Sequence, residues 1–426
     1  MGDGLVDELE QRGLVAQISD RDGLTAHLQA ESRVVYCGFD PTADSLHIGN
    51  LVPLLALRRF QLHGHRPILL LGGATGLIGD PSGRSDERNL NSGDVVAGWV
   101  ERIRAQAEGF LDFDGNNGAI IVNNLDWTAG RDVISFLRDI GKHFSVNQMI
   151  QRESVRSRLD REGEGISYTE FSYMLLQAMD YSELAERFNC SVQIGGSDQW
   201  GNIVSGIDLV RRRLHKEAFA ITVPLVTKAD GTKFGKTAGG SIWLDPARTS
   251  PYAFFQFWLN TADADVISYL QIFTFVEAGE VASLAEVTAE HPERRLAQRR
   301  LAQAVTSLVH GPQALASAER ISDCLFAGND INELTEADLR QLQQDGMDAT
   351  LLAGVRPGLL DVMVDAGLAA SRGAARKLVQ GNGVRVNGAT QTDFARELDW
   401  SDALFGRFYL LRRGKKSWHL LVRDDS

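Results

Sequence analysis

The chain has 426 residues, too many for one ordinary hydrophobic core, so we expect two or three domains. Hydrophobic residues make up 43% of the chain and charged residues 23%, a composition typical of globular rather than disordered proteins. The net charge of -12 does not favour a nucleic-acid partner, so any RNA-binding surface must come from basic residues that gather locally.

Residues 1–30 are expected to form a helical lead-in, and their acidic start does not resemble a signal peptide. From residue 33 to about 225, apolar runs typical of strands alternate with segments long enough for crossover helices. This alternation predicts an α/β fold in which helices cover a parallel sheet. The predicted strands are Val34–Phe39, Pro67–Gly72, Ala119–Asn123, Ser191–Ile194 and Ile221–Val223, and the predicted crossover helices include Leu46–Gly64 and Arg131–Phe144.

The second half of the chain loses this alternation. Residues 250–330 lack strand signals and are predicted to be helical, and the acidic, polar stretch 329–348 is typical of a linker. A short helix over 369–378 and an Asn387-Gly388 turn, typical of a tight hairpin, predict a small α+β domain at the end. The expected domains are 1–228, 229–330 and 356–426, with 331–355 as a linker.

Two motifs far apart in the chain predict a clamp for a nucleoside triphosphate. In the first, Tyr36–Asn50, an apolar strand runs into a loop, and His47-Ile-Gly-Asn50 opens a helix. The second, Lys233-Phe-Gly-Lys236-Thr237, is a glycine-hinged loop with two lysines. A helix start offers backbone N–H groups and partial positive charge, and the lysines offer ammonium groups.

Each motif alone has an ordinary alternative. A lone histidine at a helix start is usually structural, and loop lysines are usually solvated. The run Gly231–Thr237 resembles a Walker A loop but is one residue short between its glycines. The run Gly72–Asp80 does not match the dinucleotide pattern G-x-G-x-x-G, so a nicotinamide enzyme is disfavoured.

A mixed polar stripe predicts a pocket for a polar amino acid. Tyr173, Gln177 and Asp180 share one helix face, which an ordinary buried helix would keep apolar. With Tyr36 they provide hydrogen-bonding groups, and a pocket built to bind a hydroxyl rejects the analogue that lacks it.

Basic residues gather near the end of the chain. No acidic residue lies between Ala403 and Arg423, and a second acid-free basic stretch spans 371–388. Such a local excess is what binding to an RNA backbone requires, although a charge run is more often a solvated face. The candidate RNA-binding residues are Arg372, Arg376, Lys377, Arg407, Arg412, Arg413, Lys415 and Lys416.

Together these motifs resemble a known family. His47–Asn50 and Lys233–Thr237 resemble the His-Ile-Gly-His and Lys-Met-Ser-Lys-Ser signatures of class I aminoacyl-tRNA synthetases. Gly72–Ser82, Ser172–Asp180 and Gln193–Asn202 look like the bacterial tyrosyl-tRNA synthetases. The C-terminal segment resembles the RNA-binding domain that this family shares with a ribosomal small-subunit protein. The resemblance implies a Rossmann-like catalytic domain, a helical domain and a small α+β RNA-binding domain.

The resemblance also implies roles for individual residues. Tyr36 and Asp180 would meet the phenol hydroxyl of tyrosine, Asp80, Tyr173 and Gln177 its amino group, and Gln199 its carboxylate. The implied ATP-binding residues are Gly38, Asp40, His47, Asn50, Gly196, Asp198, Lys233 and Lys236, and the implied catalytic set is Asp40, Thr42, His47, Asn50, Lys233, Lys236 and Thr237. Asn50 departs from the signature, because asparagine cannot become a cation, and we expect it to contact a neutral group such as ribose.

The implied reaction joins tyrosine to ATP and then to tRNA(Tyr). ATP is a substrate that should arrive with Mg²⁺ without a dedicated protein cage, no organic prosthetic group is expected, and the family implies a homodimer. Three separated cysteines support neither a disulfide framework nor a metal site, and they fit a cytoplasmic protein. No apolar run reaches the roughly 18 residues that spanning a membrane requires.

Two other functions stay open at this point. The related tryptophan-activating enzyme would share the signatures, but indole offers only one donor to Tyr36 and Asp180. A noncatalytic RNA-binding protein on the same scaffold would not need the lysines at 233 and 236.

Overall fold

The computed structural model describes residues 4–82, 91–159, 165–232, 234–237, 240–353, 356–414 and 417–424. The chain divides into two compact units, and each is described by itself. Unit 1 comprises Met1–Leu244 and Asp263–Glu290, and unit 2 comprises Asp245–Ala262 and His291–Ser426.

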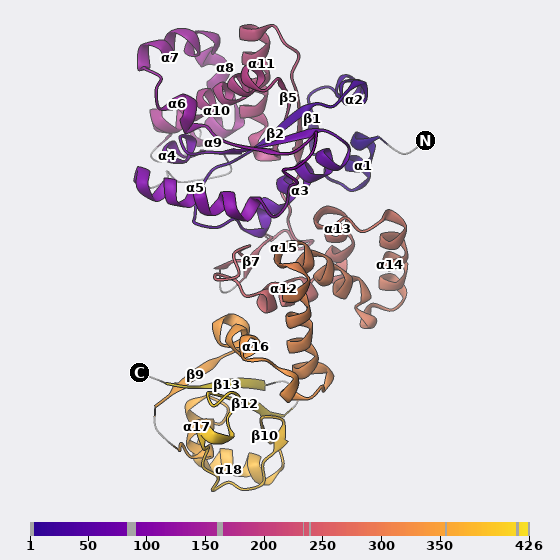
Figure 1. The fold of residues 1–426 in the computed structure, drawn as a ribbon, viewed down its shortest axis with the longest axis vertical. Coiled ribbons are helices and arrows are strands. Elements are labelled where there is room, and N and C mark those ends of the chain that lie inside the picture. Colours follow the sequence, from indigo (N-terminus) through magenta and orange to yellow (C-terminus); the bar gives the residue numbers. More distant parts are fainter. Residues whose placement is uncertain are drawn as a thin grey trace. The chain divides into compact units, whose positions relative to one another are not determined.

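Unit 1 is built on a six-stranded sheet with the order β1-β6-β5-β2-β3-β4 (Figure 1). All neighbours are parallel except β1, which pairs antiparallel with β6. The chain runs outward from β2 in both directions, so the strand order reverses between β2 and β5. The strands are β1 Gln17–Ile18, β2 Val34–Phe39, β3 Arg66–Leu71, β4 Ile120–Asn123, β5 Cys190–Gly196 and β6 Phe219–Val223.

All five predicted strands of the sheet are confirmed, with each end within two residues of the prediction. The expected lead-in contains helices α1 (Leu5–Gln11) and α2 (Arg21–Ala30), but also the edge strand β1, which the sequence analysis missed. A strand of two residues is too short to leave an alternating pattern.

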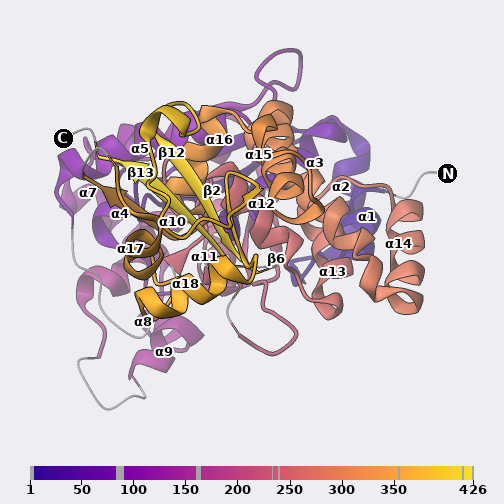
Figure 2. The same ribbon diagram turned by 90° about the horizontal axis from the view of Figure 1, so that it is seen from below.

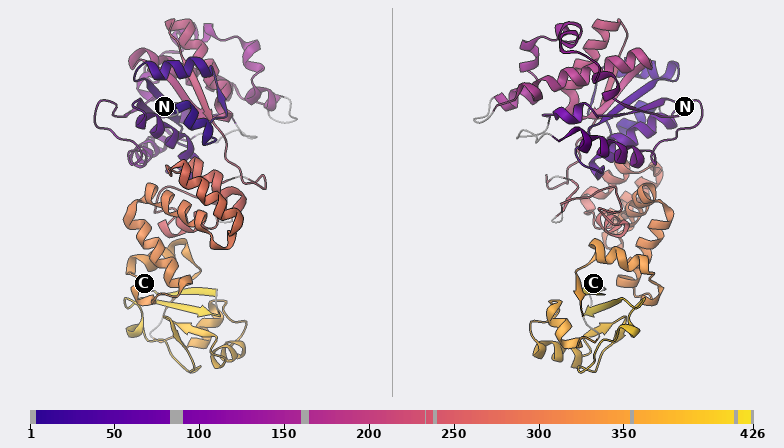
Figure 3. Two further views of the ribbon diagram at one scale, coloured as in Figure 1. Left: turned by 90° about the vertical axis from the view of Figure 1, so that its right-hand side faces the viewer. Right: turned by 60° about the vertical axis from the view of Figure 1, so that its left-hand side comes forward.

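Helices cover both faces of this sheet (Figure 3). Alternate strand residues point to opposite faces, so Tyr36, Ile68 and Leu70 pack with helices α10 (Tyr168–Arg187) and α11 (Trp200–Leu214) in one buried core. Helix α3 (Ile48–Leu62) lies against the strands from the other side (Figure 1). The remaining helices before residue 200 are α4 Thr75–Ile78, α5 Gly93–Ala107, α6 Leu125–Thr128, α7 Val133–Asp139, α8 Val146–Ile150 and α9 Glu153–Leu159.

After the sheet, unit 1 adds a small hairpin and two helices. The hairpin pairs β7 (Lys236–Thr237) with β8 (Gly240–Ser241). Helices α13 (Asp263–Phe273) and α14 (Ala278–Glu290) lie side by side (Figures 1 and 2).

Unit 2 joins helices to a five-stranded sheet with the order β11-β10-β12-β13-β9. Asn387 and Gly388 both have positive φ between β10 and β11, which confirms the predicted hairpin turn. The elements are helices α12 Pro251–Leu259, α15 Leu296–Ser322, α16 Glu336–Gln341, α17 Leu359–Asp365 and α18 Arg372–Gln380, and strands β9 Ala349–Leu352, β10 Val384–Val386, β11 Ala389–Thr390, β12 Phe408–Arg413 and β13 Ser417–Arg423.

The units differ from the expected division at 229, 331 and 356. Helices α13 and α14 belong to unit 1, whereas α12 and α15 belong to unit 2. The expected linker 331–355 holds α16 and β9, and its Leu334, Leu339 and Leu342 are buried against Phe408 and Leu420 of the terminal sheet. The composition of this segment is polar and acidic because only every third or fourth residue faces the core, so its buried leucines do not stand out in the sequence.

Candidate active site

A cavity of about 480 Å³ opens at the carboxyl ends of the parallel strands of unit 1. It lies where the strand order reverses, between β2 and β5, which is the usual place for a ligand in such sheets. Thirteen of the predicted tyrosine-binding, ATP-binding and catalytic residues line this one cavity: Tyr36, Gly38, Asp40, Thr42, His47, Asn50, Asp80, Tyr173, Gln177, Asp180, Gly196, Asp198 and Gln199.

Asp40 is held at the end of β2 by two hydroxyl donors. The Tyr173 hydroxyl donates to its Oδ2 at 2.6 Å, and the Thr75 hydroxyl donates to Oδ1 at 2.6 Å. A Cβ atom added to Gly72 would lie 2.0 Å from Asp40 Oδ1, so only glycine leaves room for this carboxylate. The Asp40 side chain is therefore fixed before any ligand binds.

Asp180 is buried under the cavity and accepts two hydrogen bonds. Asn124 Nδ2 donates to its Oδ2 at 2.9 Å, and Trp127 Nε1 donates to its Oδ1 at 2.8 Å. Burial raises the pKa of Asp180 to about 7, although both donors counteract this by favouring the carboxylate. Each oxygen keeps a second lone pair, so the group can still accept a hydrogen bond from a ligand hydroxyl.

Three buried polar atoms that belong to cavity-lining residues have no hydrogen-bond partner among the residues that the structure describes. They are the Tyr36 hydroxyl and the amide oxygens of Gln177 and Gln193. Buried polar atoms are almost always paired, so this group indicates that a polar ligand completes their hydrogen bonds.

The cavity is also lined by two more carboxylates, those of Asp80 and Asp198. Gln199 Nε2 donates to Asp80 Oδ2 at 2.5 Å, and the Ser82 N–H donates to Asp80 Oδ1 at 2.9 Å. Burial raises the pKa of Asp198, and the nearby negative charge of Asp80 adds to that effect. Two acidic side chains in one wall favour a ligand that brings an ammonium group or hydroxyl donors.

His47 and Asn50 cap the start of α3. His47 Nδ1 accepts from the Gly49 N–H at 3.0 Å, and Asn50 Oδ1 accepts from the His47 N–H at 3.0 Å. Burial lowers the pKa of His47, so the ring is neutral at pH 7. Because Nδ1 accepts, Nε2 carries the proton and is the donor available to a ligand. The oxygen of Asn50 is used in the cap, which leaves its NH2 group as the remaining donor.

Backbone hydrogen bonds join the two distant motifs. The Ile48 N–H donates to the Ile242 carbonyl at 3.0 Å, and the Leu244 N–H donates to the Leu46 carbonyl at 2.8 Å. The chain that follows the lysine loop, residues 233–237, therefore runs along the start of α3. The structure describes the backbone of Lys236 and Thr237 in β7 but not their side chains, and Lys233 lies outside the described residues.

The candidate RNA-binding residues that the structure describes belong to unit 2 and are not among the residues that line this cavity. Arg372, Arg376 and Lys377 are exposed on α18, while Arg407, Arg412 and Arg413 lie at or next to β12. Lys415 and Lys416 lie outside the described residues.

Several residues that support the site are not among the predicted site residues. Asn124, Trp127 and Thr75 hold the carboxylates described above, and Gln193 supplies one of the unpaired amide oxygens. Asn124 and Trp127 directly follow the predicted strand that ends at Asn123. Their place at the carboxyl end of a parallel strand was a usable signal.

The described part of the chain holds no group of three or more His, Cys, Asp or Glu residues arranged to bind a metal ion. None of its described helices combines the length and the apolar character needed to cross a membrane.

Comparison with known proteins agrees with this geometry. Residues 29–327 match the family described as tRNA synthetases class I (W and Y), and residues 338–421 match the tyrosine–tRNA ligase SYY-like C-terminal domain. The fold and the site thus define a class I aminoacyl-tRNA synthetase of the tryptophan and tyrosine group.

Within that group the chain belongs to the family of bacterial tyrosine–tRNA ligases. It is 54% identical to the tyrosine–tRNA ligase of Dechloromonas aromatica over 417 residues and 55% identical to that of Yersinia pestis over 418 residues, with 98% of each chain covered. A C-terminally truncated mitochondrial tyrosyl-tRNA synthetase of Aspergillus nidulans superposes with a TM-score of 0.69 at 30% identity, over 76% of this chain and 94% of that one.

Proposed function

We propose that this chain activates L-tyrosine with ATP and then transfers it to the 3′-terminal ribose of tRNA(Tyr). The observation that carries the proposal is the unpaired, buried hydroxyl of Tyr36 in the cavity that Asp180 also lines. A phenol hydroxyl can donate to the carboxylate and accept from Tyr36, which would satisfy both groups. An indole N–H can only donate, so it would leave Tyr36 without an acceptor.

The chemistry needs no protein nucleophile. The tyrosine carboxylate attacks the α-phosphorus of ATP, a P–O bond forms, and pyrophosphate leaves. A ribose hydroxyl of the tRNA then attacks the carbonyl of tyrosyl-adenylate, and AMP leaves. The protein contributes positioning and stabilisation of the charge that develops on the phosphates.

Different residues in the walls of the cavity would bind different groups of the two substrates. Tyr36 and Asp180 would bind the phenol, and Asp80, Tyr173 and Gln177 the ammonium group. The Tyr173 hydroxyl donates to Asp40, so its oxygen can still accept from the ammonium. Gln199 would support the tyrosine carboxylate and Asp198 the ribose of ATP. The residues proposed to stabilise the phosphates are Asp40, Thr42, His47, Asn50, Lys233, Lys236 and Thr237, with Gly38 and Gly196 leaving room for the nucleotide.

Mg²⁺ would enter with ATP, since phosphate oxygens and water supply most of its ligands. The ion would neutralise phosphate charge, while His47 Nε2 donates from the start of α3.

A homodimer and a cytoplasmic location stay proposals. Large apolar side chains are exposed on α7 and α8 of unit 1, where Val133 and Ile134 are each 70% exposed and Val146 is 57% exposed. A monomer would leave this surface in water, so these helices are where we expect a second copy to bind.

The test uses a matched pair of tyrosines. Tyr36 and Tyr181 lie with ring centroids 5.2 Å apart, but the Tyr181 hydroxyl donates to the Phe219 carbonyl at 2.9 Å. In ATP–pyrophosphate exchange with tyrosine, phenylalanine and tryptophan, the wild type should use tyrosine. Tyr36→Phe should reduce the preference for tyrosine over phenylalanine by roughly 10-fold, because one hydrogen bond in a dry pocket contributes about 1–1.5 kcal/mol.

Tyr181→Phe is the control, and it should keep the preference for tyrosine. Exchange that tryptophan supports better than tyrosine would assign the chain to the tryptophan-activating enzymes instead. Absence of exchange with all three amino acids would leave only a noncatalytic RNA-binding role.

A further inference from the structure

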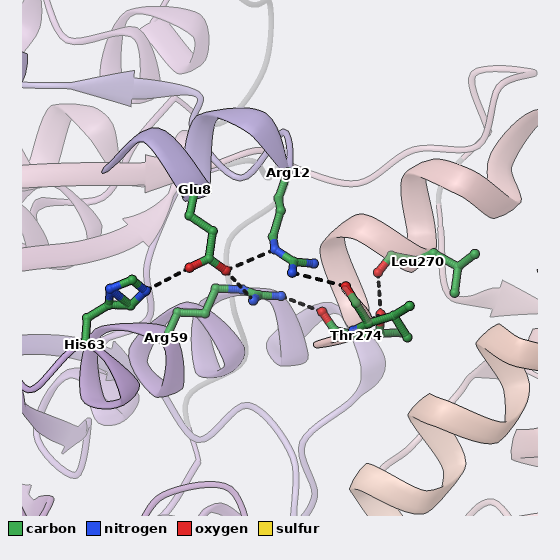
Figure 4. A network of polar contacts seen from close by, with 7 residues as sticks. Glu8, Arg12, Arg59, His63, Leu270 and Thr274 are labelled. Carbon is green, nitrogen blue, oxygen red and sulfur yellow. Dashed lines mark hydrogen bonds and ion pairs between the residues drawn. The ribbon is translucent and has the colours of Figure 1, made fainter. Parts of the chain in front are cut away.

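A network of polar and charged side chains with one buried arginine lies near the end of α3, opposite the end that starts after His47 (Figure 4). Glu8 on α1 accepts from Arg12 Nε at 3.0 Å, from Arg59 Nη1 at 3.1 Å and from His63 Nε2 at 2.8 Å. Only 2% of the Arg59 side chain is exposed. Burial lowers the pKa of Arg59 to about 10, so the guanidinium stays charged at neutral pH.

The same arginines reach the end of α13. Arg59 Nη2 donates to the Thr274 carbonyl at 2.5 Å, and Arg12 Nη2 donates to the Val276 carbonyl at 3.1 Å. The guanidinium carbon of Arg59 also lies 4.4 Å from the centre of the Phe275 ring. Thr274 directly follows the last residue of α13, whereas Val276 lies beyond the helix. Carbonyls at a helix end lack partners within the helix and carry partial negative charge, so the Arg59 guanidinium binds well there.

Helix α13 in turn holds the chain that leads into the lysine loop. Phe234, the residue after Lys233, packs against Tyr269 and Phe273 with ring centroids 5.0 Å apart in both pairs. Asp265 Oδ1 accepts from the Ala229 N–H at 2.8 Å. The segment before Lys236 is therefore anchored on α13.

Helix α3 holds the other side of the same loop. A Cβ atom added to Gly235 would lie 3.0 Å from Ile48 Cγ1, so the loop backbone touches the first turn of α3. The Ile48 N–H is also bonded to the Ile242 carbonyl, just after the β7–β8 hairpin. The loop thus spans α3 and α13, and the charge network connects these two helices.

We infer that Arg59, oriented by Glu8, is a positioning residue for adenylate formation: it fixes α13 against α3 and thereby sets the lysine loop relative to His47. The inference rests on the proposed function. Replacing a buried ion pair by apolar side chains is often neutral for stability, so stability alone does not explain a buried arginine here. A planar guanidinium can bond a carboxylate and a helix carbonyl at once in fixed geometry, which neither methionine nor lysine can do.

The test compares Arg59→Met, Arg59→Lys and a matched control, Arg131→Met. Arg131 is also mostly buried and bonds Glu183 at 2.9 Å, but Glu183 lies on α10 rather than on α1, α3 or α13. The measurements are single-turnover formation of tyrosyl-adenylate at saturating ATP and tyrosine, and equilibrium binding of tyrosine. Arg59→Met should slow adenylate formation by about 10²-fold, the usual effect of a misplacement of about 1 Å, with tyrosine affinity unchanged.

Arg59→Lys should recover part of the rate, because the charge remains while one of the two bonds is lost. Arg131→Met should keep a near-normal rate. Combined with Phe234→Ala, Arg59→Met should add little further loss, because both changes release the same loop.

A folded Arg59→Met protein with a normal single-turnover rate would overturn the inference. It would also be overturned if the rate loss of the double variant equalled the product of the losses of Arg59→Met and Phe234→Ala. An equal loss of tyrosine affinity and of rate would show general damage and would overturn it too. These outcomes concern variants of an active wild type. A wild type that forms no tyrosyl-adenylate would overturn the proposed function, and this inference with it.

Discussion

The cavity of unit 1 and the basic residues of unit 2 use polar side chains in opposite ways. In the cavity, hydrogen bonds run from Tyr173 through Asp40 and Thr75 to Asn124 and on to Asp180. Each link holds the next, so the site is rigid before a ligand enters. Such preorganisation suits a small molecule whose every polar atom must be matched.

The basic residues of unit 2 are held one by one. Arg372 Nε lies 3.1 Å from Asp361 Oδ1, the Arg376 guanidinium lies 4.6 Å from the centre of the Phe394 ring, and Arg413 Nη1 donates to the Leu368 carbonyl at 2.7 Å. Exposed charges of this kind suit a phosphate backbone, which is bound by many weak and separate contacts. A single substitution should therefore cause a large loss of activity in the cavity and only a small loss of RNA binding on this surface.

The largest effect is expected at the lysine loop. Lys236→Ala should slow adenylate formation by about 10²–10³-fold and leave tyrosine binding nearly unchanged, because the ammonium is needed when charge develops on the leaving pyrophosphate. Adding Lys233→Ala should cost less than the product of the single losses if the loop closes as a unit. The measurement is the single-turnover rate at saturating ATP, with tyrosine affinity from equilibrium binding. A folded variant with a near-normal rate would remove the loop from the ATP site.

The next effect is expected at Asp180. Asp180→Asn keeps the size of the side chain but leaves only one oxygen to accept from Asn124 and Trp127. Tyrosine activation should fall by about 2–4 kcal/mol in kcat/KM, and the preference over phenylalanine should shrink. Steady-state exchange with both amino acids measures this. Discrimination equal to that of the wild type would refute the role of Asp180.

The same variant gives a pH signature in stability. The pKa of Asp180 is about 7 in the folded protein and about 4 in an unfolded chain, so folding takes up a proton between these values. Wild-type stability should therefore fall as pH rises from about 4 to 7, whereas Asp180→Asn lacks this contribution. Between pH 4.5 and 7.5, the free energy of unfolding of Asp180→Asn should rise relative to that of the wild type by on the order of 1 kcal/mol or more. Denaturant unfolding of both proteins at these two pH values measures this. A constant difference between the two proteins would contradict the raised pKa.

Local sequence patterns account for more of the residues that line the cavity than of the contacts that define the two units. Tyr36 can be placed because strand alternation puts its segment at the carboxyl edge of a parallel sheet, where ligands bind. Asp180 is indicated by the polar helix face that it shares with Tyr173 and Gln177, and His47 by its signature at a helix start. The hydrogen bonds that Asn124 and Trp127 donate to Asp180 could not be predicted from the sequence, since they depend on how α6 packs beside α10. The grouping of α13 with unit 1 depends on the contacts of Arg59 and Phe234, which are far apart in sequence. No local pattern records such contacts, and local signals are what a single sequence contains.

The smallest effect is expected on α18. Neutralising Arg372, Arg376 and Lys377 together by alanine should weaken tRNA binding roughly 10-fold at moderate salt and leave tyrosyl-adenylate formation unchanged. Each lost phosphate contact should also make the dependence of log K on log salt shallower by somewhat less than 1. The measurement is tRNA affinity over a salt series. Arg340→Ala is the control: this arginine is exposed on α16, pairs with Glu336 at 2.5 Å and is not a candidate RNA contact. If the triple variant kept both the affinity and the salt slope of the Arg340→Ala control, α18 would not be part of the RNA-binding surface. If adenylate formation fell with tRNA affinity, the separation between a rigid cavity and a surface of independent charges would itself be wrong.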